Sequence, residues 1–297
     1  MLRALLSLLI LGSLQTSPSF TGEEAAMPEV ERTFDTSSLI EIHSIPTLKA
    51  GKIEPVIYAN AGYALDLTAN TILYTENEHD KLPIASLTKL MTAYIILEEE
   101  DLDSVVTVSY NAANTEGSKV WLGTGETITV ESLLYGLLIP SGNDCAVALA
   151  EFNAGSEENF VAKMNQKAKQ LDLNETYFTS ASGLDDQGYS TAKDLAFLSM
   201  YLLKNDFIRN ITSLTSATVT GTDGYPTHNL TSTNQLLGSY LNVKGLKTGK
   251  TGAAGECLIT VAENEQNHEI LTVILGSQDR FGETKLLLDW LYNSYIW

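Results

Sequence analysis

Basic side chains are scarce in this sequence, which holds 18 Lys and Arg residues against 37 Asp and Glu residues. The net charge of −19 argues against a nucleic-acid-binding protein, because such proteins neutralise phosphates with clustered cations. It also argues against attachment to a membrane through a polybasic patch. Gly and Pro are not in excess and 44% of the residues are hydrophobic, so we expect a globular chain rather than a disordered one.

The apolar run near the N-terminus is too short to span a bilayer as a helix. Arg3 precedes this run at residues 4–11, and small residues follow it. The pattern is typical of a secretory signal. Since no clean cleavage motif follows, we predict that residues 1–19 are a signal peptide or a retained N-terminal anchor that tethers the chain to a membrane. Both predict an extracytoplasmic protein, which is secreted, periplasmic or associated with the cell envelope.

Cysteine is also rare, since only Cys145 and Cys257 occur. An exported chain could join them in one disulfide bond, but a chain of this length does not need one. Free cysteine is commonly a small buried residue, so we predict two buried thiols. The sequence has no cluster of His, Cys, Asp and Glu with metal-ligand spacing, and no metal or cofactor is expected.

The composition changes near residue 50. Residues 20–50 mix acidic residues with Pro, Ser and Thr without a sustained period, which predicts a flexible acidic linker. Residues 51–297 are predicted to form one domain, with strands towards both of its ends and helices between them. This order indicates an α+β fold, in which an antiparallel sheet from both chain ends packs against a mostly helical subregion. Strands are expected at 56–58, 63–67, 71–74, 243–246, 257–261 and 270–275, and helices after Ser86, at 130–139, after Asn143, at 194–203 and at 286–291.

Three short motifs carry polar side chains that could form a reactive site. In the first, Ser86 and Lys89 lie three residues apart and share one face of a predicted helix, whose orphan N–H groups favour a developing anion. In the second, Ser141-Gly142-Asn143 lies in a turn between two predicted helices. In the third, Lys247-Thr248-Gly249 ends a predicted strand. Singly, each is an ordinary capped helix, turn or strand end, but their order over separations of 55 and 106 residues makes coincidence improbable.

With these motifs the sequence resembles the D-alanyl-D-alanine carboxypeptidases, the low-molecular-mass penicillin-binding proteins. The resemblance covers about residues 50–297 and implies the fold of β-lactamases and penicillin-binding proteins. It departs from the family at Lys250, a position often held by His or Tyr, and in having no counterpart of the β-rich second domain and C-terminal amphipathic anchor of many members. The segments that carry it are 83–93 (PIASLTKLMTA), 133–144 (LLYGLLIPSGND), 182–184 (SGL), 191–195 (TAKDL) and 244–249 (KGLKTG), followed by Thr251, Ala254 and Gly255.

The resemblance implies a role for each catalytic residue. Ser86 is the nucleophile that attacks the carbonyl between two terminal D-alanines and forms an acyl-enzyme. Lys89 is its base, provided that burial keeps the amine neutral. Ser141 relays a proton and Asn143 holds the amide backbone of the substrate. The backbone N–H groups of Ser86 and Lys250 form the oxyanion hole.

The third motif is expected to bind the substrate. A terminal carboxylate needs a cation and a hydroxyl, which Lys247 and Thr248 supply. Gly249, the Lys250 backbone and Thr251 complete the predicted substrate-binding residues. The expected partners are peptidoglycan stem peptides that end in D-alanyl-D-alanine, with β-lactam antibiotics as covalent inhibitors, and the expected role is in peptidoglycan biosynthesis and cell shape.

Several other functions compete with this prediction. An endopeptidase that cleaves crosslinks would use the same residues. A class A β-lactamase needs a deacylating glutamate, for which Glu175 is the nearest candidate in unlike surroundings. A peptidoglycan or β-lactam sensor of the same fold would not need the nucleophile and base.

Two further readings of the motifs fit poorly. Residues 245–251 resemble a phosphate loop, but only three residues separate the glycines and a strand is expected to follow. Histidine-based serine hydrolysis lacks support, because no G-x-S-x-G motif accompanies the four histidines, at positions 43, 79, 228 and 268.

Overall fold

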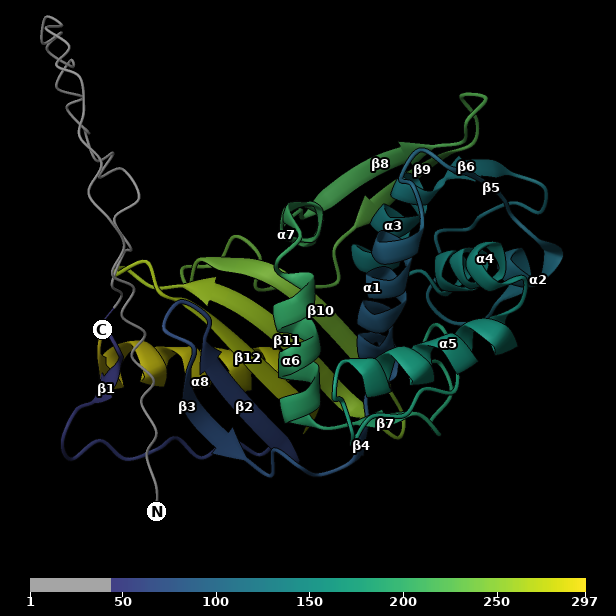
Figure 1. The fold of residues 1–297 in the computed structure, drawn as a ribbon. Coiled ribbons are helices and arrows are strands. Elements are labelled where there is room, and N and C mark those ends of the chain that lie inside the picture. The colour runs from purple at the N-terminus through teal and green to yellow at the C-terminus, as the bar shows by residue number, and fades with distance from the viewer. Residues whose placement is uncertain (1–43) are drawn as a thin grey trace, which may run out of the picture. The chain divides into compact units, whose positions relative to one another are not determined.

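The computed structural model describes residues 44–297, and its main feature is a five-stranded antiparallel sheet (Figure 1). Strands from both ends of the described chain meet in this sheet, in the order β10-β11-β12-β2-β3. This confirms the predicted α+β class. The predicted signal segment and most of the predicted linker, residues 1–43, lie outside the described residues. The strands are β2 (Ala61–Asp66), β3 (Thr71–Glu76), β10 (Val243–Thr251), β11 (Gly255–Glu263) and β12 (Glu269–Ser277).

Both faces of this sheet are covered by helices. Helix α8 (Arg280–Ser294) packs on one face against β11 and β12, and α6 (Ala192–Leu202) packs on the other against β12 and β2. Alternate residues of a strand point to opposite faces, so Leu271 and Val273 join one apolar cluster, and Ile270 and Ile274 join the other. The nearly continuous apolar sequence of β12 follows from this double burial.

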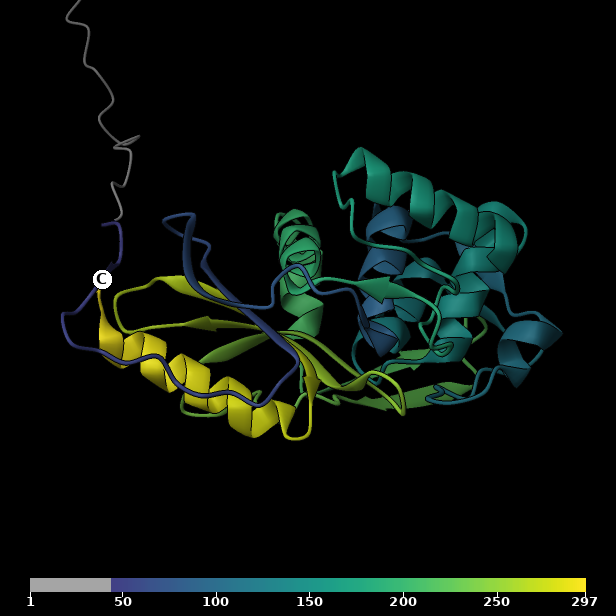
Figure 2. The same cartoon turned by 90° about the horizontal axis from the view of Figure 1, so that it is seen from below.

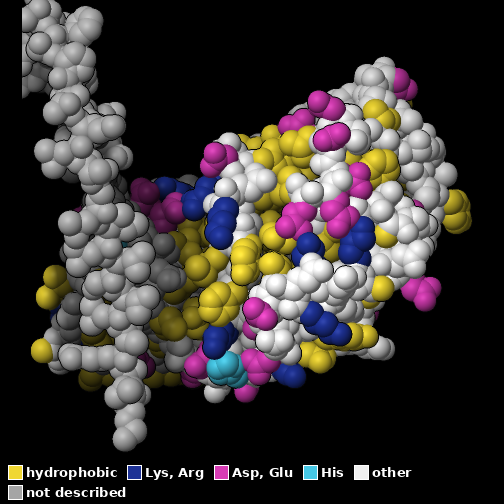
Figure 3. Space-filling view, in the orientation of Figure 1, with side chains coloured by type: hydrophobic (Ala, Val, Ile, Leu, Met, Phe, Trp, Pro, Cys, Tyr) yellow, Lys and Arg dark blue, Asp and Glu magenta, His cyan; other side chains and the backbone are white. Residues whose placement is uncertain are grey.

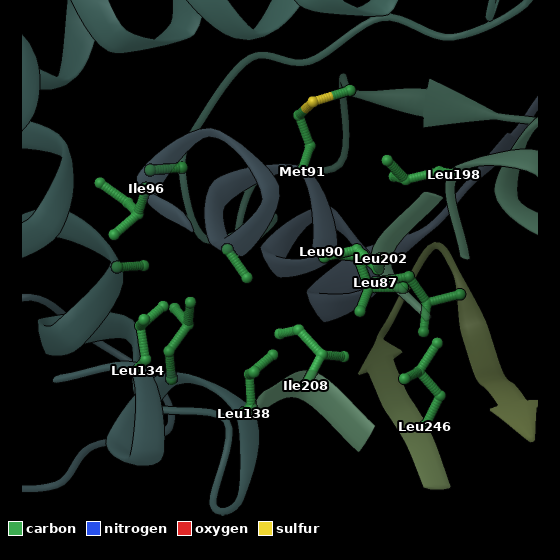
Figure 4. Packing of buried hydrophobic residues seen from close by; sticks show 14 of the residues in the cluster. Leu87, Leu90, Met91, Ile96, Leu134, Leu138, Leu198, Leu202, Ile208 and Leu246 are labelled. Atoms are coloured by element: carbon green, nitrogen blue, oxygen red, sulfur yellow. The ribbon is translucent and has the colours of Figure 1, made fainter. Parts of the chain in front are cut away.

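The helical region surrounds α1 (Lys89–Glu99), which contacts α3, α4, α5 and α6. Five of its apolar side chains are completely buried, and Figure 4 shows several of them packed against residues of neighbouring elements; the five are Leu90, Met91, Ala93, Ile95 and Ile96. Burial on this scale fixes the N-terminal end of α1, where the first motif lies. The other helices are α2 (Tyr110–Asn114), α3 (Val130–Leu138), α4 (Asn143–Ala154), α5 (Glu157–Gln170) and α7 (Asp206–Thr212).

The strand predicted at 56–58 is wrong. This segment follows an extended path along α8, which Figure 2 shows from below. Side chains of α8 bind the backbone in and next to this segment. Trp290 Nε1 donates to Ile53 O at 2.7 Å, and the Glu283 carboxylate accepts from Tyr58 N. Of the three residues only Ile57 is buried, in the apolar cluster of α8, while Val56 and Tyr58 are exposed, so the segment lies along a helix rather than pairing with a strand.

The remaining strands form two-stranded pairs. β1 (Thr47–Leu48), which lies within the predicted linker, pairs with β13 (Tyr295–Ile296). The hairpin of β8 (Ser216–Thr220) and β9 (Thr227–Thr231) was not predicted, because its threonine-rich strands alternate only weakly between apolar and polar residues. The shorter pairs are β4 (Leu82–Pro83) with β7 (Tyr189–Ser190), and β5 (Val105–Thr107) with β6 (Thr127–Thr129).

Charged side chains of both signs are interspersed on the face shown in Figure 3. Within residues 44–297, none of the helices combines the length and apolar character needed to cross a bilayer.

Candidate active site

The first motif forms a tight turn directly before the central helix. Ser86 lies in the 3₁₀ turn η2 (Ala85–Thr88), which runs into α1 at Lys89. We expected Ser86 at the cap or first turn of a helix, and the 3₁₀ turn is a close variant of that position. Leu87 is completely buried while Ser86 stays partly exposed, so the apolar neighbour anchors the turn and leaves the hydroxyl accessible.

Lys89 is completely buried and its Nζ has three polar contacts. It lies 3.0 Å from Ser86 Oγ, 2.7 Å from Asn143 Oδ1 and 2.8 Å from Ser182 O. A neutral amine has two hydrogens and one lone pair, so it can donate to the two carbonyl oxygens and accept from the serine hydroxyl. The contacts thus match the requirements of a base for Ser86.

Burial lowers the pKa of Lys89 to about 7, although the nearby Asp144 carboxylate favours the charged form. Desolvation disfavours an ammonium ion, and within residues 44–297 none of the hydrogen-bond partners of Lys89 Nζ is a carboxylate oxygen. A substantial fraction of Lys89 is therefore neutral near pH 7.

The second motif forms the turn between α3 and α4. Ser141 has a φ of +68°, and its buried Oγ has no hydrogen-bond partner among residues 44–297. Asn143 Nδ2 donates to Glu116 O at 2.7 Å, while Oδ1 accepts from Lys89. Asn143 Nδ2 thus keeps one hydrogen for a substrate, and Asn143 Oδ1 positions the lysine.

The third motif lies on β10, the edge strand of the sheet. Lys247 is completely buried, and its Nζ donates to Thr248 O at 3.0 Å. Burial, together with the charges of Lys89 and Arg280, lowers the pKa of Lys247 well below its ordinary value. The Thr248 hydroxyl shares a 2.5 Å hydrogen bond with Thr233 Oγ1. The motif thus holds a buried amine and a hydroxyl that is oriented by a second threonine.

Two glycines allow three chain segments to meet at Ser86. A Cβ added at Gly183, where φ is +72°, would lie 2.0 Å from Ala85 O. A Cβ added at Gly249 would lie 3.2 Å from Ser86 N. The nucleophile turn is therefore packed between the loop at Gly183 and β10, and side chains at either glycine would displace it.

Two predicted substrate-binding residues have side chains engaged elsewhere. Lys250 is exposed, and its Nζ pairs with Glu256 Oε1 at 2.8 Å. The Thr251 hydroxyl donates to Asp186 Oδ1 at 2.7 Å. The backbone of Lys250 lies next to Gly249 on the open edge of the sheet, where alternate N–H groups of a strand are not used in pairing.

Sequence reasoning missed several residues that hold the site together. Ser182 and Glu116 contribute only backbone oxygens, which no side-chain motif reveals. Arg280 NH1 donates to Gly249 O at 2.7 Å from the start of α8. Asp144 is completely buried and accepts hydrogen bonds from the N–H groups of Val120, Trp121 and Leu122. Asp144 and Ser182 lie in the segments 133–144 and 182–184 that carry the family resemblance, but the sequence assigned no role to either.

The competing sequence interpretations can be compared with the described part of the chain. Cys145 and Cys257 are both free and buried, which confirms the predicted thiols. Glu175 binds His79 at 2.6 Å, with both side chains partly exposed. The phosphate-loop-like segment lies in β10, which leads into another strand. Among residues 44–297 no group of three or more His, Cys, Asp and Glu side chains is suited to a metal ion.

Two solved structures illustrate the similarity of the fold. The Streptomyces K15 DD-transpeptidase superposes with a TM-score of 0.75 at 31% identity, covering 82% of this chain and 100% of that one. The D-alanyl-D-alanine carboxypeptidase from Mycobacterium tuberculosis H37Rv superposes with a TM-score of 0.76 at 30% identity, covering 83% and 96%. This chain thus has the fold of the penicillin-binding-protein-like DD-peptidases, and Ser86 and Lys89 lie together in it.

The chain belongs to the D-alanyl-D-alanine carboxypeptidase family, whose model matches residues 49–279. DacF of Bacillus subtilis strain 168, a D-alanyl-D-alanine carboxypeptidase, is 37% identical over 252 residues, which cover 80% of this chain. The D-alanyl-D-alanine carboxypeptidase of Streptomyces sp. strain K15 is 36% identical over 242 residues, covering 75% of this chain and 83% of that protein. The present chain spans 63% of the length of DacF.

Proposed function

We propose that this protein is a serine-type D-alanyl-D-alanine carboxypeptidase that removes the terminal D-alanine from peptidoglycan stem pentapeptides. The observation that carries the proposal is the position of Lys89, a buried amine with a pKa of about 7, at 3.0 Å from Ser86 Oγ. Such a pair can generate a serine nucleophile at neutral pH without a histidine. The family of the chain supports the choice of substrate.

In the first half of the proposed reaction, Ser86 Oγ attacks the carbonyl carbon between the two D-alanines while Lys89 Nζ takes its proton. The tetrahedral oxyanion is stabilised by the backbone N–H groups of Ser86 and Lys250. Ser141, whose hydroxyl has no partner among residues 44–297, relays the proton from Lys89 Nζ to the leaving amine, so Lys89 becomes neutral again. The C–N bond then breaks, free D-alanine departs, and the rest of the peptide stays bound to Ser86 as an acyl-enzyme.

The second half of the reaction removes the acyl group. Water attacks the ester carbonyl while Lys89 accepts its proton, and the proton returns to Ser86 Oγ as the peptide leaves. A β-lactam would open on Ser86 by the same first step, and slow attack by water would leave the enzyme acylated.

The carboxylate of the terminal D-alanine binds at the third motif. Lys247 and the hydroxyl of Thr248 contact it, and the incoming negative charge favours the protonated form of Lys247. Gly249 lets β10 approach the nucleophile turn, and the Lys250 backbone faces the scissile carbonyl. Thr251, whose hydroxyl donates to Asp186 Oδ1, is the last of the proposed substrate-binding residues at the end of β10.

Residues 51–297 form the proposed carboxypeptidase domain. A substrate in the cell wall requires an extracytoplasmic protein, and the sequence pattern at residues 1–19 supports export with a cleaved signal or a retained anchor.

The similarity to a DD-transpeptidase supports a second fate for the acyl-enzyme. An amine from another stem peptide would then replace water as the acceptor. The protein should be incubated with a D-alanyl-D-alanine pentapeptide, with and without an acceptor amine, and the products separated by mass spectrometry. Release of D-alanine with a tetrapeptide product supports the carboxypeptidase, whereas a crosslinked product formed in preference to tetrapeptide supports the transpeptidase. Absence of both products, with no β-lactam adduct on Ser86, would overturn both.

A further inference from the structure

Trp121 is a strongly exposed aromatic residue on the loop between α2 and β6. Its side chain is 78% exposed, and its φ is +70°. A bulky side chain is disfavoured in this left-handed region and adopts it only where the surrounding structure imposes it. The exposure of Trp121 is therefore a feature that the neighbouring residues maintain.

The Asp144 carboxylate imposes this conformation. Its Oδ2 accepts hydrogen bonds from the N–H groups of Val120, Trp121 and Leu122 at 2.8 to 3.2 Å. The side chains of Val120 and Leu122 are buried, so they anchor the loop on both sides of the tryptophan. With both neighbours held inward and the backbone bound to a buried carboxylate, the indole projects outward from a fixed position.

The same loop borders the catalytic residues. Asn143 donates through Nδ2 to Glu116 O and through its backbone N to Ser118 O, both at 2.7 Å. Asn143 is also in direct contact with Lys89. The loop that carries Trp121 is thus bound to Asn143 of the second motif and to Asp144 directly after it, and it forms the border of the site on that side.

We propose that Trp121 is a specificity-determining residue that packs against apolar parts of the stem peptide, and that Asp144 is the positioning residue that presents it. This inference rests on the proposed function, because it takes a peptide ending in D-alanyl-D-alanine as the ligand. An indole offers a large, rigid apolar surface at a small cost in side-chain entropy. The Lys119 ammonium lies 5.5 Å from the ring centroid and further restricts its orientation.

The first experiment measures binding without turnover. A synthetic tripeptide that ends in D-alanyl-D-alanine is titrated calorimetrically into Ser86→Ala protein. Adding Trp121→Ala should weaken the Kd about five- to tenfold, and Trp121→Phe about twofold, as expected for an aromatic contact. Tyr110→Ala is the matched control, because Tyr110 on α2 is an exposed aromatic residue of similar exposure, 74%, outside the loop.

Three results would overturn the proposal: an unchanged Kd for Trp121→Ala, an equal loss for Tyr110→Ala, or no binding of the tripeptide to the Ser86→Ala protein. With Ser86 intact, Trp121→Ala should raise KM more than it lowers kcat. A protein that binds the tripeptide in a Trp121-dependent manner but never releases D-alanine would disprove the carboxypeptidase activity and keep the Trp121 assignment.

The second experiment tests the role of Asp144. Asp144→Asn should weaken tripeptide binding about as much as Trp121→Ala, and the double variant should lose little more, because both changes remove one contact. The tryptophan emission of Asp144→Asn should also differ from that of the wild type, and this difference should vanish when both proteins carry Trp121→Phe. Full additivity of the two losses, or an emission difference that survives Trp121→Phe, would reject Asp144 as the residue that positions Trp121.

Discussion

Asn143 Oδ1 lies 2.7 Å from Lys89 Nζ, so the second motif binds the base of the first motif directly. The contact joins residues 54 positions apart, and both are buried. A neutral amine held by one asparagine oxygen and one backbone carbonyl can keep its lone pair directed at Ser86. The reactivity of the serine is therefore a property of the assembled site, and the following predictions test its parts.

Ser86→Ala should abolish covalent labelling by penicillin and lower D-alanine release at least about a thousandfold, because no other hydroxyl replaces the nucleophile. The side chain is partly exposed and small, so the thermal unfolding midpoint should stay close to that of the wild type. Intact-protein mass spectrometry after incubation with a β-lactam measures the adduct. A penicilloyl adduct on the Ser86→Ala protein would refute the assignment of the nucleophile.

The rate of acylation should rise with pH through about 7 and level off above it. The physical reason is the lowered pKa of Lys89, since only the neutral amine can accept the serine proton, and acid protonates it. The check is the pH dependence of the second-order rate constant for β-lactam acylation. Lys89→Ala should lose most of this rate. A flat profile between pH 6 and 8, or wild-type acylation by Lys89→Ala, is incompatible with the proposed base.

Gly183→Ala should destabilise the protein by about 2–4 kcal/mol and impair acylation, because the new methyl group would overlap Ala85 O and push on the nucleophile turn. Gly252→Ala is the matched control, since no heavy atom lies within 4 Å of a Cβ added there. Urea unfolding and β-lactam acylation should be measured on both variants. Equal behaviour of the two would mean that the close approach at Gly183 is not required.

Lys247→Ala should slow acylation by substrates with a free terminal carboxylate by a factor of about 30 to several thousand, or roughly 2–5 kcal/mol. Amidation of the last D-alanine should cause a similar loss, because each change removes one partner of the same ion pair. The two losses should therefore not add. The test measures the acylation rates of the wild type and of Lys247→Ala, each with the free-acid substrate and with the amidated substrate. Equal processing of acid and amide by the wild type would exclude a carboxylate site at the third motif.

Much of the fold could be predicted because local periodicity decides it. The apolar residues after Ser86 recur at helical spacing and do form α1, and the two apolar runs near the C-terminus do form the adjacent strands β11 and β12. The prediction of a strand at 56–58 was wrong because this segment lies along a helix, α8, that follows more than 200 residues later in the sequence. The hairpin of β8 and β9 was missed because threonine suits both buried and exposed positions.

The sequence alone determined which reactive groups are present and how far apart Ser86 and Lys89 lie along the chain. Because the two residues are three positions apart across a tight turn, the hydroxyl and the amine come together whatever surrounds them. Tertiary structure decided whether that amine is a base. Burial beside Asn143 and the Ser182 carbonyl lowers its pKa to about 7, and desolvation is a property of the packed core rather than of neighbouring residues along the chain. Likewise, only the folded chain brings the backbone N–H groups of residues 120–122 into contact with the Asp144 carboxylate. The sequence could not predict this contact, because almost every residue has a backbone N–H group and no pattern of side chains marks the ones that bind.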